Sequence, residues 1–191
     1  MRELETERLL LRHIYEDDAE DFYHNITSSE NIARYVTWHA HKSIAETVAF
    51  IKYCVDDYEN LSCYRWAIEL KETGELIGMI DVVSYHEGEP ELGYLLAEKH
   101  QNCGYMTEAC RAVVKYLFEE GFKTLYIEAL KDNFASNRVI EKTGFHFVRE
   151  YQRPQSQSKP QLVDVNAYRI NRNYSDQYGE KTEGKIPNER I

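Results

Sequence analysis

The segment from residue 91 to residue 145 constrains the fold most, because strand and helix signals alternate in it around glycine-bearing turns. Residues 91–97 and 125–130 are typical of strands, and residues 105–120 and 134–142 are typical of helices. Gly121 and Gly144 follow the two predicted helices, where a glycine commonly ends a helix. Strand–helix alternation predicts a sheet with helices on its faces.

The rest of the chain predicts two further helices and five further strands. Helices are predicted at residues 17–27 and from residue 44, the second opened by a capping box of Ser43 and Glu46. Its apolar stripe consists of Ile44, Val48, Ile51, Val55 and Tyr58. Strands are predicted at 8–14, 64–70, 76–85, 145–153 and 162–171, with an antiparallel hairpin across 71–75. The order predicts an α/β (α+β) fold with a mixed sheet of about seven strands and about four helices.

Length and charge limit the classes of protein. A chain of 191 residues suits one well-buried core, so we expect a single domain over residues 1–172. Residues 173–191 contain few apolar side chains and are expected to form a flexible tail. The net charge of -10 argues against a nucleic-acid partner, which requires a basic face. It would suit a cationic partner, although an ordinary acidic surface explains it equally well.

The cysteines and the apolar runs indicate a reduced, soluble protein. Cys54, Cys63, Cys103 and Cys110 form no C-x-x-C pair and have no histidine at metal-ligand spacing, so no metal site is expected. The first residues lack the layout of a signal peptide, and no apolar run approaches the ~20 residues of a membrane span. We therefore expect a cytoplasmic protein without a membrane partner.

The turn before residue 105 has the features of an anion-binding site. A helix start offers free backbone N–H groups and the positive end of the helix dipole, and Gly104 permits a close approach. Read alone, one glycine before a helix also fits an ordinary loop. The turn lacks the Lys-Ser/Thr ending of a P-loop and the three glycines of a dinucleotide fingerprint, which disfavours a nucleotide-binding domain.

A glycine also interrupts the preceding strand. Gly93 lies in the middle of residues 91–97, where glycine marks a bulge or the close approach of another backbone or a ligand. A strand that splays at this point leaves amides and carbonyls free to bind a peptide-like ligand. Such a ligand would extend away from the turn at Gly104.

Four motifs in this region resemble, in their order, the GNAT superfamily of acetyl-CoA-dependent N-acetyltransferases. They are Glu-Leu-Gly-Tyr at 91–94, Gln-x-x-Gly-x-Met at 101–106, Thr-Glu-Ala at 107–109, and Asn-x-x-Ser at 133–136 with Glu-Lys-x-Gly-Phe at 141–145. Residues 6–12, with Ser43 and Glu46, resemble the RimJ/RimL-like branch, which acetylates protein N-termini and small amines. The similarity covers roughly residues 5–170.

The resemblance implies a mostly antiparallel sheet that is splayed between its fourth and fifth strands, with acetyl-CoA in the gap. By motif, the pyrophosphate would be held at Gln101, Asn102, Cys103, Gly104, Tyr105, Met106 and Thr107. Pantetheine would pair with Tyr94, Leu95 and Leu96 and contact Asn133. Ser136 would lie near the thioester sulfur. The acceptor would be a protein N-terminus or a small-molecule amine, and the enzyme a monomer or homodimer.

The catalytic side chains are less clearly specified. Glu91 is the first candidate for a general base and Glu128 the second, although either can be an ordinary sheet carboxylate. His39 and His41 lie in a loop that resembles the substrate side of the family. Trp38, His41 and Tyr85 are the predicted acceptor-binding residues, although aromatic side chains near strands are usually core.

The general acid departs from a common family pattern. Many members have a tyrosine four residues before the glycine of the Gly-Phe ending, where this chain has Ile140. Ser136, with Asn133 beside it, is the remaining candidate, and its alternative role is a hydroxyl in the first helical turn. A covalent mechanism at Cys103 is disfavoured because the family places this turn at the other end of the cofactor. Ile140 also motivates a second hypothesis, a CoA-binding regulatory or partner-binding module with weak catalysis.

Overall fold

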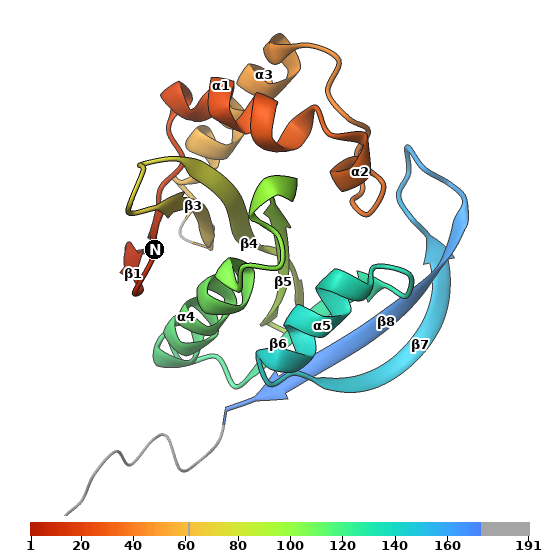
Figure 1. Ribbon diagram of the computed structural model, residues 1–191. Coiled ribbons are helices and arrows are strands. Elements are labelled where there is room, and N and C mark those ends of the chain that lie inside the picture. The colour runs from red at the N-terminus through yellow and green to blue at the C-terminus, as the bar shows by residue number, and fades with distance from the viewer. Residues whose placement is uncertain (61, 173–191) are drawn as a thin grey trace, which may run out of the picture.

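A computed structural model describes residues 1–60 and 62–172, so the predicted tail at 173–191 lies outside the described residues. One eight-stranded sheet runs through the molecule in the order β1-β2-β3-β4-β5-β6-β8-β7 (Figure 1). Its strands are β1 (Leu4–Glu5), β2 (Leu9–Arg12), β3 (Arg65–Leu70), β4 (Leu76–His86), β5 (Glu89–Leu96), β6 (Thr124–Leu130), β7 (His146–Pro154) and β8 (Leu162–Asn171). This mixed, mostly antiparallel sheet confirms the predicted fold class.

The sheet is splayed between β5 and β6, as predicted. These two parallel strands pair only at Glu91 with Tyr126 and at Leu92 with Ile127. The other strand pairs of the described chain are antiparallel, including the predicted β3–β4 hairpin. Beyond Leu92 and Ile127 the two halves of the sheet diverge, and the C-terminal ends of β5 and β6 leave a gap.

Helices cover both faces of the sheet. They are α1 (Ala19–Phe22), α2 (Glu30–Ala33), α3 (Ile44–Asp57), α4 (Tyr105–Glu119) and α5 (Phe134–Lys142). In Figure 1, α4 and α5 lie in front of the sheet, whereas α1 and α3 lie together at the top. The main core joins α4 to β2–β6, and a second cluster joins α1 and α3 to β3 and β4. No helix among the described residues is both long and apolar enough to cross a membrane.

The short elements differ from the sequence prediction. β1 has two residues and α2 has four, too few for a periodic apolar pattern, and neither was predicted. The predicted helix at 17–27 is divided into a 3-10 turn (Glu16–Asp18), α1 and a π-helical turn (Tyr23–Thr27). Gly121 and Gly144 do end α4 and α5, with φ of 107° and 98°.

The buried face of α3 was also predicted incorrectly. Ile44 and Val48 of the expected stripe are 42% and 49% exposed, and the buried residues of the helix are Thr47, Ile51 and Cys54. Thr47 is buried because its hydroxyl bonds Thr27 Oγ1 at 2.6 Å. The predicted capping box is not formed, since the Ser43 side chain caps no backbone N–H of the helix.

Candidate active site

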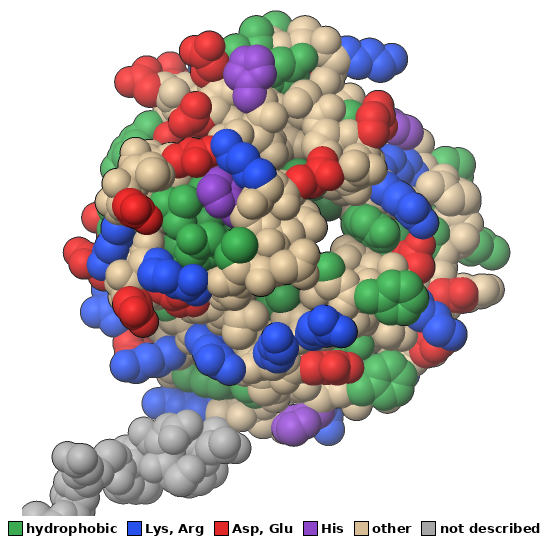
Figure 2. Space-filling model, in the orientation of Figure 1, with side chains coloured by type: hydrophobic (Ala, Val, Ile, Leu, Met, Phe, Trp, Pro, Cys, Tyr) green, Lys and Arg blue, Asp and Glu red, His purple; other side chains and the backbone are tan. Residues whose placement is uncertain are grey.

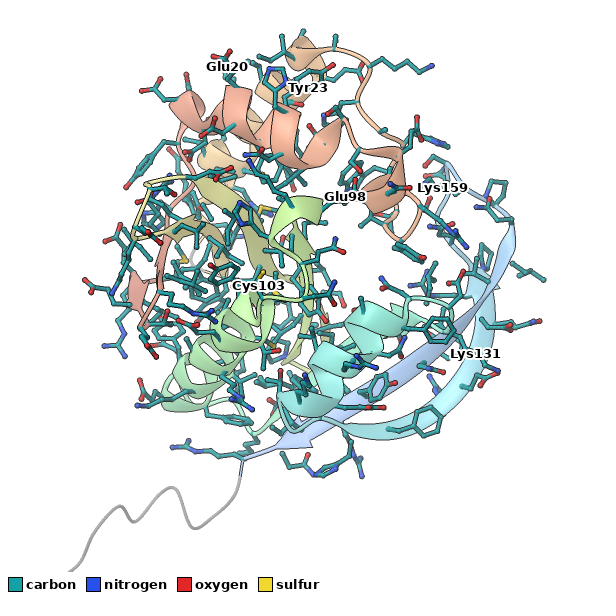
Figure 3. All side chains as sticks on the ribbon, viewed as in Figure 1. Glu20, Tyr23, Glu98, Cys103, Lys131 and Lys159 are labelled. Atoms are coloured by element: carbon teal, nitrogen blue, oxygen red, sulfur yellow. The ribbon has the colours of Figure 1, made fainter. Side chains whose placement is uncertain are left out.

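The turn before α4 presents a row of free backbone amides. Gly104 has φ of +84° and Asn102 has φ of +62°, left-handed conformations that fold the chain sharply into the helix. Among the described residues, the amides of residues 102–107 donate no hydrogen bond to protein groups. Residues 101–104 are exposed, and Cys103 is labelled at this end of α4 in Figure 3. The turn is therefore suited to an anionic ligand.

Glu108 anchors this turn to the N-terminal strand region. Its carboxylate accepts hydrogen bonds from Thr6 Oγ1 at 2.6 Å, Arg8 N at 2.9 Å and Arg8 Nε at 2.7 Å. Burial raises the pKa of Glu108, but these hydrogen bonds outweigh burial and hold the pKa below its usual range. Arg8 also donates to Cys103 O at 3.0 Å and lies over the Tyr105 ring. The guanidinium therefore offsets a negative charge that would otherwise repel phosphate.

The strand beyond the splay leads from this turn into the gap. Tyr94, Leu95 and Leu96 pair with β4 on one side, and on the other side β6 does not pair with them. Gln101 Nε2 donates to Leu96 O at 3.3 Å, which joins the turn to the end of the strand. A polar backbone edge thus faces the gap beside the amides of the turn.

Gly93 has a structural reason within the protein. The register of β4 and β5 shifts between Val82 and Ser84, which is one of the two alternatives that the sequence left open. A Cβ on Gly93 would lie 2.7 Å from Val83 Cγ1, so any other residue at this position would force the Val83 side chain to move. The bulged Val83 therefore requires a glycine opposite it.

The start of α5 lies across the gap from β5. Asn133 caps the helix, its Oδ1 accepting from Ser136 N at 3.1 Å. The hydroxyl of Tyr94 reaches over from β5 and lies 2.9 Å from Ser136 Oγ and 3.1 Å from Ser136 O. Burial raises the pKa of Tyr94 far above its usual range, so this phenol stays protonated. The structure thus brings the predicted Tyr94, Asn133 and Ser136 together.

Ile140 does not face the gap. Its side chain is fully buried in the main core between α5 and the sheet. This position therefore supplies packing rather than chemistry, and Ser136 with its Tyr94 partner is the hydroxyl pair at the start of α5.

The two candidate bases lie on the face of the sheet opposite α4. Leu92 and Ile127 are buried in the α4 core, so by strand alternation Glu91 and Glu128 point to the other face. Glu91 Oε2 is 2.7 Å from Ser84 Oγ and 2.6 Å from His86 Nε2. Glu128 accepts from Tyr151 Oη at 2.6 Å and forms an ion pair with Arg153.

A cavity of about 680 Å³ opens at the carboxyl end of β6, between α2, α5 and the β7–β8 connection. Figure 2 shows the corresponding face of the molecule hollowed beside β5. Its polar lining includes Arg34, His39, Lys131, Asp132, Gln155 and Lys159. Of these, only His39 was noted in the sequence, since the others come from three segments with no shared motif.

The predicted acceptor-binding residues lie elsewhere. His41 Nδ1 is 2.8 Å from Thr47 Oγ1 and is packed near Trp38, and burial lowers the pKa of this histidine despite Glu46 nearby. Trp38 packs against the second core cluster. Tyr85 donates to Ser62 O at 2.8 Å and lines a separate cavity of about 380 Å³. The structure brings Trp38 and His41 together, whereas Tyr85 lies beside the other cavity.

Comparisons with known proteins identify the family. The chain matches the family described as Acetyltransferase (GNAT) domain over residues 8–146. It is 33% identical over 145 residues to the Bacillus subtilis protein called uncharacterized N-acetyltransferase YoaA, covering 74% of this chain and 81% of the relative.

Two solved structures share the fold. One is the microcin C7 self immunity acetyltransferase MccE in complex with acetyl-CoA and AMP, with a TM-score of 0.77 at 22% identity. The match covers 87% of this chain and 93% of the MccE chain. An acetyltransferase from Salmonella typhimurium that modifies the N-terminal serine of ribosomal protein L7/L12 has a TM-score of 0.76 at 18% identity, covering 88% and 97%. The match over residues 8–146 and the YoaA identity together show that the chain belongs to the GNAT family of acetyltransferases.

Proposed function

We propose that the chain transfers an acetyl group directly from acetyl-CoA to a primary amine within a ternary complex. One observation carries this proposal: the free amides before α4, the unpaired edge of β5 and the start of α5 surround a single gap in the sheet. A long ligand with phosphates at one end and a peptide-like arm fits this order of groups. The bound acetyl-CoA would supply an activated acetyl thioester.

The cofactor-binding residues follow from the same arrangement. The amides of residues 102–107 would hold the pyrophosphate, with the Thr107 hydroxyl beside them. The backbone of Tyr94, Leu95 and Leu96 would hold the pantetheine arm as a neighbouring strand would, and Asn133 would contact that arm. Each of these segments is fixed before binding, since Glu108, Gln101 and the α5 cap hold them.

The acceptor determines how much a base contributes. An α-amine with a pKa near ~8 costs about 1 kcal/mol to deprotonate at neutral pH, whereas a lysine-type amine near ~10.4 costs about 4–5 kcal/mol. Glu91 is the proposed base, since it lies at the first of the two positions where β5 pairs with β6, on the face opposite α4, with its Oε2 in contact with His86 and Ser84. Glu128 is the second candidate, although Arg153 and Tyr151 already occupy its oxygens. An α-amine therefore suits this site best.

Ser136 is the proposed partner of the leaving thiolate. The protonated Tyr94 hydroxyl can donate to Ser136 Oγ, which leaves the serine proton free to point into the gap. A backbone N–H of the Tyr94–Leu96 segment is the proposed donor to the oxyanion. Ser136 and Tyr94 together would take the role of the tyrosine that many family members have at the position of Ile140.

A thiol-release assay with acetyl-CoA and a panel of peptides, polyamines and aminoglycosides tests the proposal. Turnover with a peptide N-terminus would place the chain with the Salmonella enzyme that modifies a ribosomal protein, and turnover with a small amine would give the other acceptor class. No turnover with any amine would refute the proposed activity. Thermal stabilisation by CoA without turnover would instead support the binding-module alternative.

A further inference from the structure

The β7–β8 connection is fastened to the segment after α2 by two buried polar side chains. Gln155 and Lys159 are 5% and 7% exposed, although both residue types are usually found at the surface. Gln155 Nε2 donates to Arg34 O and Val36 O, both at 2.8 Å. Lys159 Nζ donates to Ala33 O at 2.5 Å and Val36 O at 3.3 Å. We call these two side chains the latch.

The latch connects segments that are 119 to 126 residues apart in the sequence. Its donors reach the carbonyl of Ala33, the last residue of α2, and those of Arg34 and Val36 just after the helix. Burial lowers the pKa of Lys159, although Glu30 nearby opposes this. Arg34 O accepts from no other group among the described residues, and Val36 O accepts from both side chains, so the latch holds the connection against the end of α2.

The latch lies at the wall of the cavity. Both of its side chains line the 680 Å³ space, together with Leu130 and Phe134 at the start of α5. Figure 3 shows Lys159 on the α2 side of this region and Lys131 on the opposite side. Lys131 also lines the cavity, but its Nζ pairs with Glu150 of β7 at 2.8 Å and not with α2. Both lysines place a positive charge at the cavity, but only Lys159 holds the β7–β8 connection to α2. Lys131 is therefore a control for the effect of charge alone.

We propose that the 680 Å³ cavity receives the acceptor, and that Lys159 and Gln155 are positioning residues that set the width of this cavity and thereby select which amines can enter. This inference rests on the proposed function. The turn at residues 101–107 makes no contact with the latch among the described hydrogen bonds, so release of the latch leaves cofactor binding unchanged. The acceptor, which must fit between the β7–β8 connection and α2, loses its fitted wall.

The experiment compares Lys159→Met, Gln155→Leu and Lys131→Met with the parent chain. Methionine and leucine keep the apolar bulk of the replaced side chains and remove the donors. For each folded variant, the acceptor KM, kcat, the CoA dissociation constant and the thermal midpoint are measured with the best acceptor from the panel and with a bulkier amine.

The latch variants are expected to raise the acceptor KM roughly tenfold, as for a lost hydrogen-bonded wall, with an unchanged CoA dissociation constant. The ratio of kcat/KM for the bulkier amine to that for the best acceptor should also rise. If folded Lys159→Met has the acceptor KM of the parent, the proposed role of the latch is refuted, while the proposed acetyltransferase function is not affected. An equal rise of KM in Lys131→Met refutes the role of the latch too, since cavity charge would then be the cause. Absence of turnover by the parent chain refutes the proposed function itself, and the inference with it.

Should Lys159→Met fail to fold, Gln155→Leu and the conservative Lys159→Arg take its place. Arginine retains a charged donor, so the acceptor KM of Lys159→Arg should stay close to that of the parent chain. A KM for Lys159→Arg as high as that of Gln155→Leu would contradict a role for the donor at position 159.

Discussion

Replacement of Ser136 by alanine should separate stability from turnover. The Tyr94 hydroxyl has two acceptors on the same residue, Ser136 Oγ at 2.9 Å and Ser136 O at 3.1 Å. In Ser136→Ala the phenol keeps the carbonyl, and Asn133 still caps the helix through Ser136 N. The free energy of unfolding should therefore fall by only about 0.5–1 kcal/mol.

The effect on turnover should be larger. If the serine proton meets the leaving thiolate, kcat of Ser136→Ala should fall roughly 10²-fold, the scale of a lost general acid. Tyr94→Phe is the matched variant, because it removes the phenol and leaves the serine in place. It should cost about 1–1.5 kcal/mol of stability and reduce kcat less than Ser136→Ala does.

Urea unfolding and the thiol-release assay measure these quantities for both single variants and the double variant. Because the two hydroxyls act together, their effects on kcat should not be additive, and the double variant should resemble Ser136→Ala. A kcat of Ser136→Ala equal to that of the parent would remove Ser136 from the mechanism. Additive losses would show that the two hydroxyls act independently.

Further perturbations test the turn, the base and a buried carboxyl. Gly104→Val should weaken the thermal stabilisation by CoA strongly, because a left-handed non-glycine residue costs about 1–2 kcal/mol and distorts the amide row; parental CoA affinity would contradict the anion-binding role. Glu91→Gln should flatten the rise of kcat/KM with pH, and a parental profile would show that Glu91 is not the base. Burial raises the pKa of Asp81 to about 6 although Arg65 opposes it. Since the unfolded carboxyl titrates near ~3.9, the free energy of unfolding should fall by up to about 3 kcal/mol between pH 4 and pH 7 relative to Asp81→Asn. A constant difference between parent and Asp81→Asn over this range would refute the buried-carboxyl assignment.

The parts of the fold with long periodic patterns could be predicted from the sequence, and the short ones could not. β3, β4, β5, α4 and α5 lie within a few residues of their predicted bounds because apolar periodicity and terminal glycines act locally. α2 has four residues, and the carbonyls at its end and just after it accept from Gln155 and Lys159, contacts that no local pattern reveals. The error in α3 has the same origin, because Thr47 is buried by a tertiary hydrogen bond to Thr27.

The two halves of the candidate site differ for the same reason. The turn at Gly104 depends on backbone conformation within a few residues, so a single glycine indicates it. The 680 Å³ cavity is assembled from residues near 34, 131 and 159, which become neighbours only when β8 lies between β6 and β7. The Tyr94–Ser136 contact likewise spans 42 residues and the gap in the sheet. The sequence motifs predicted both Tyr94 and Ser136 as site residues, but they did not predict that the two hydroxyls contact each other.

The anchoring by Glu108 of the turn at residues 101–107 also bears on the order in which the protein assembles. Thr6 and Arg8 reach their carboxylate partner only after 100 or more further residues have been synthesised. During synthesis β2 can pair with β3 before α4 has emerged, but Thr6 and Arg8 can bind Glu108 only after α4 has packed against these strands. The turn is thus held by contacts of very high sequence separation, which carry a larger loop-closure entropy cost than local contacts do. Truncation of the first eight residues should impair ligand binding at a turn almost 100 positions away.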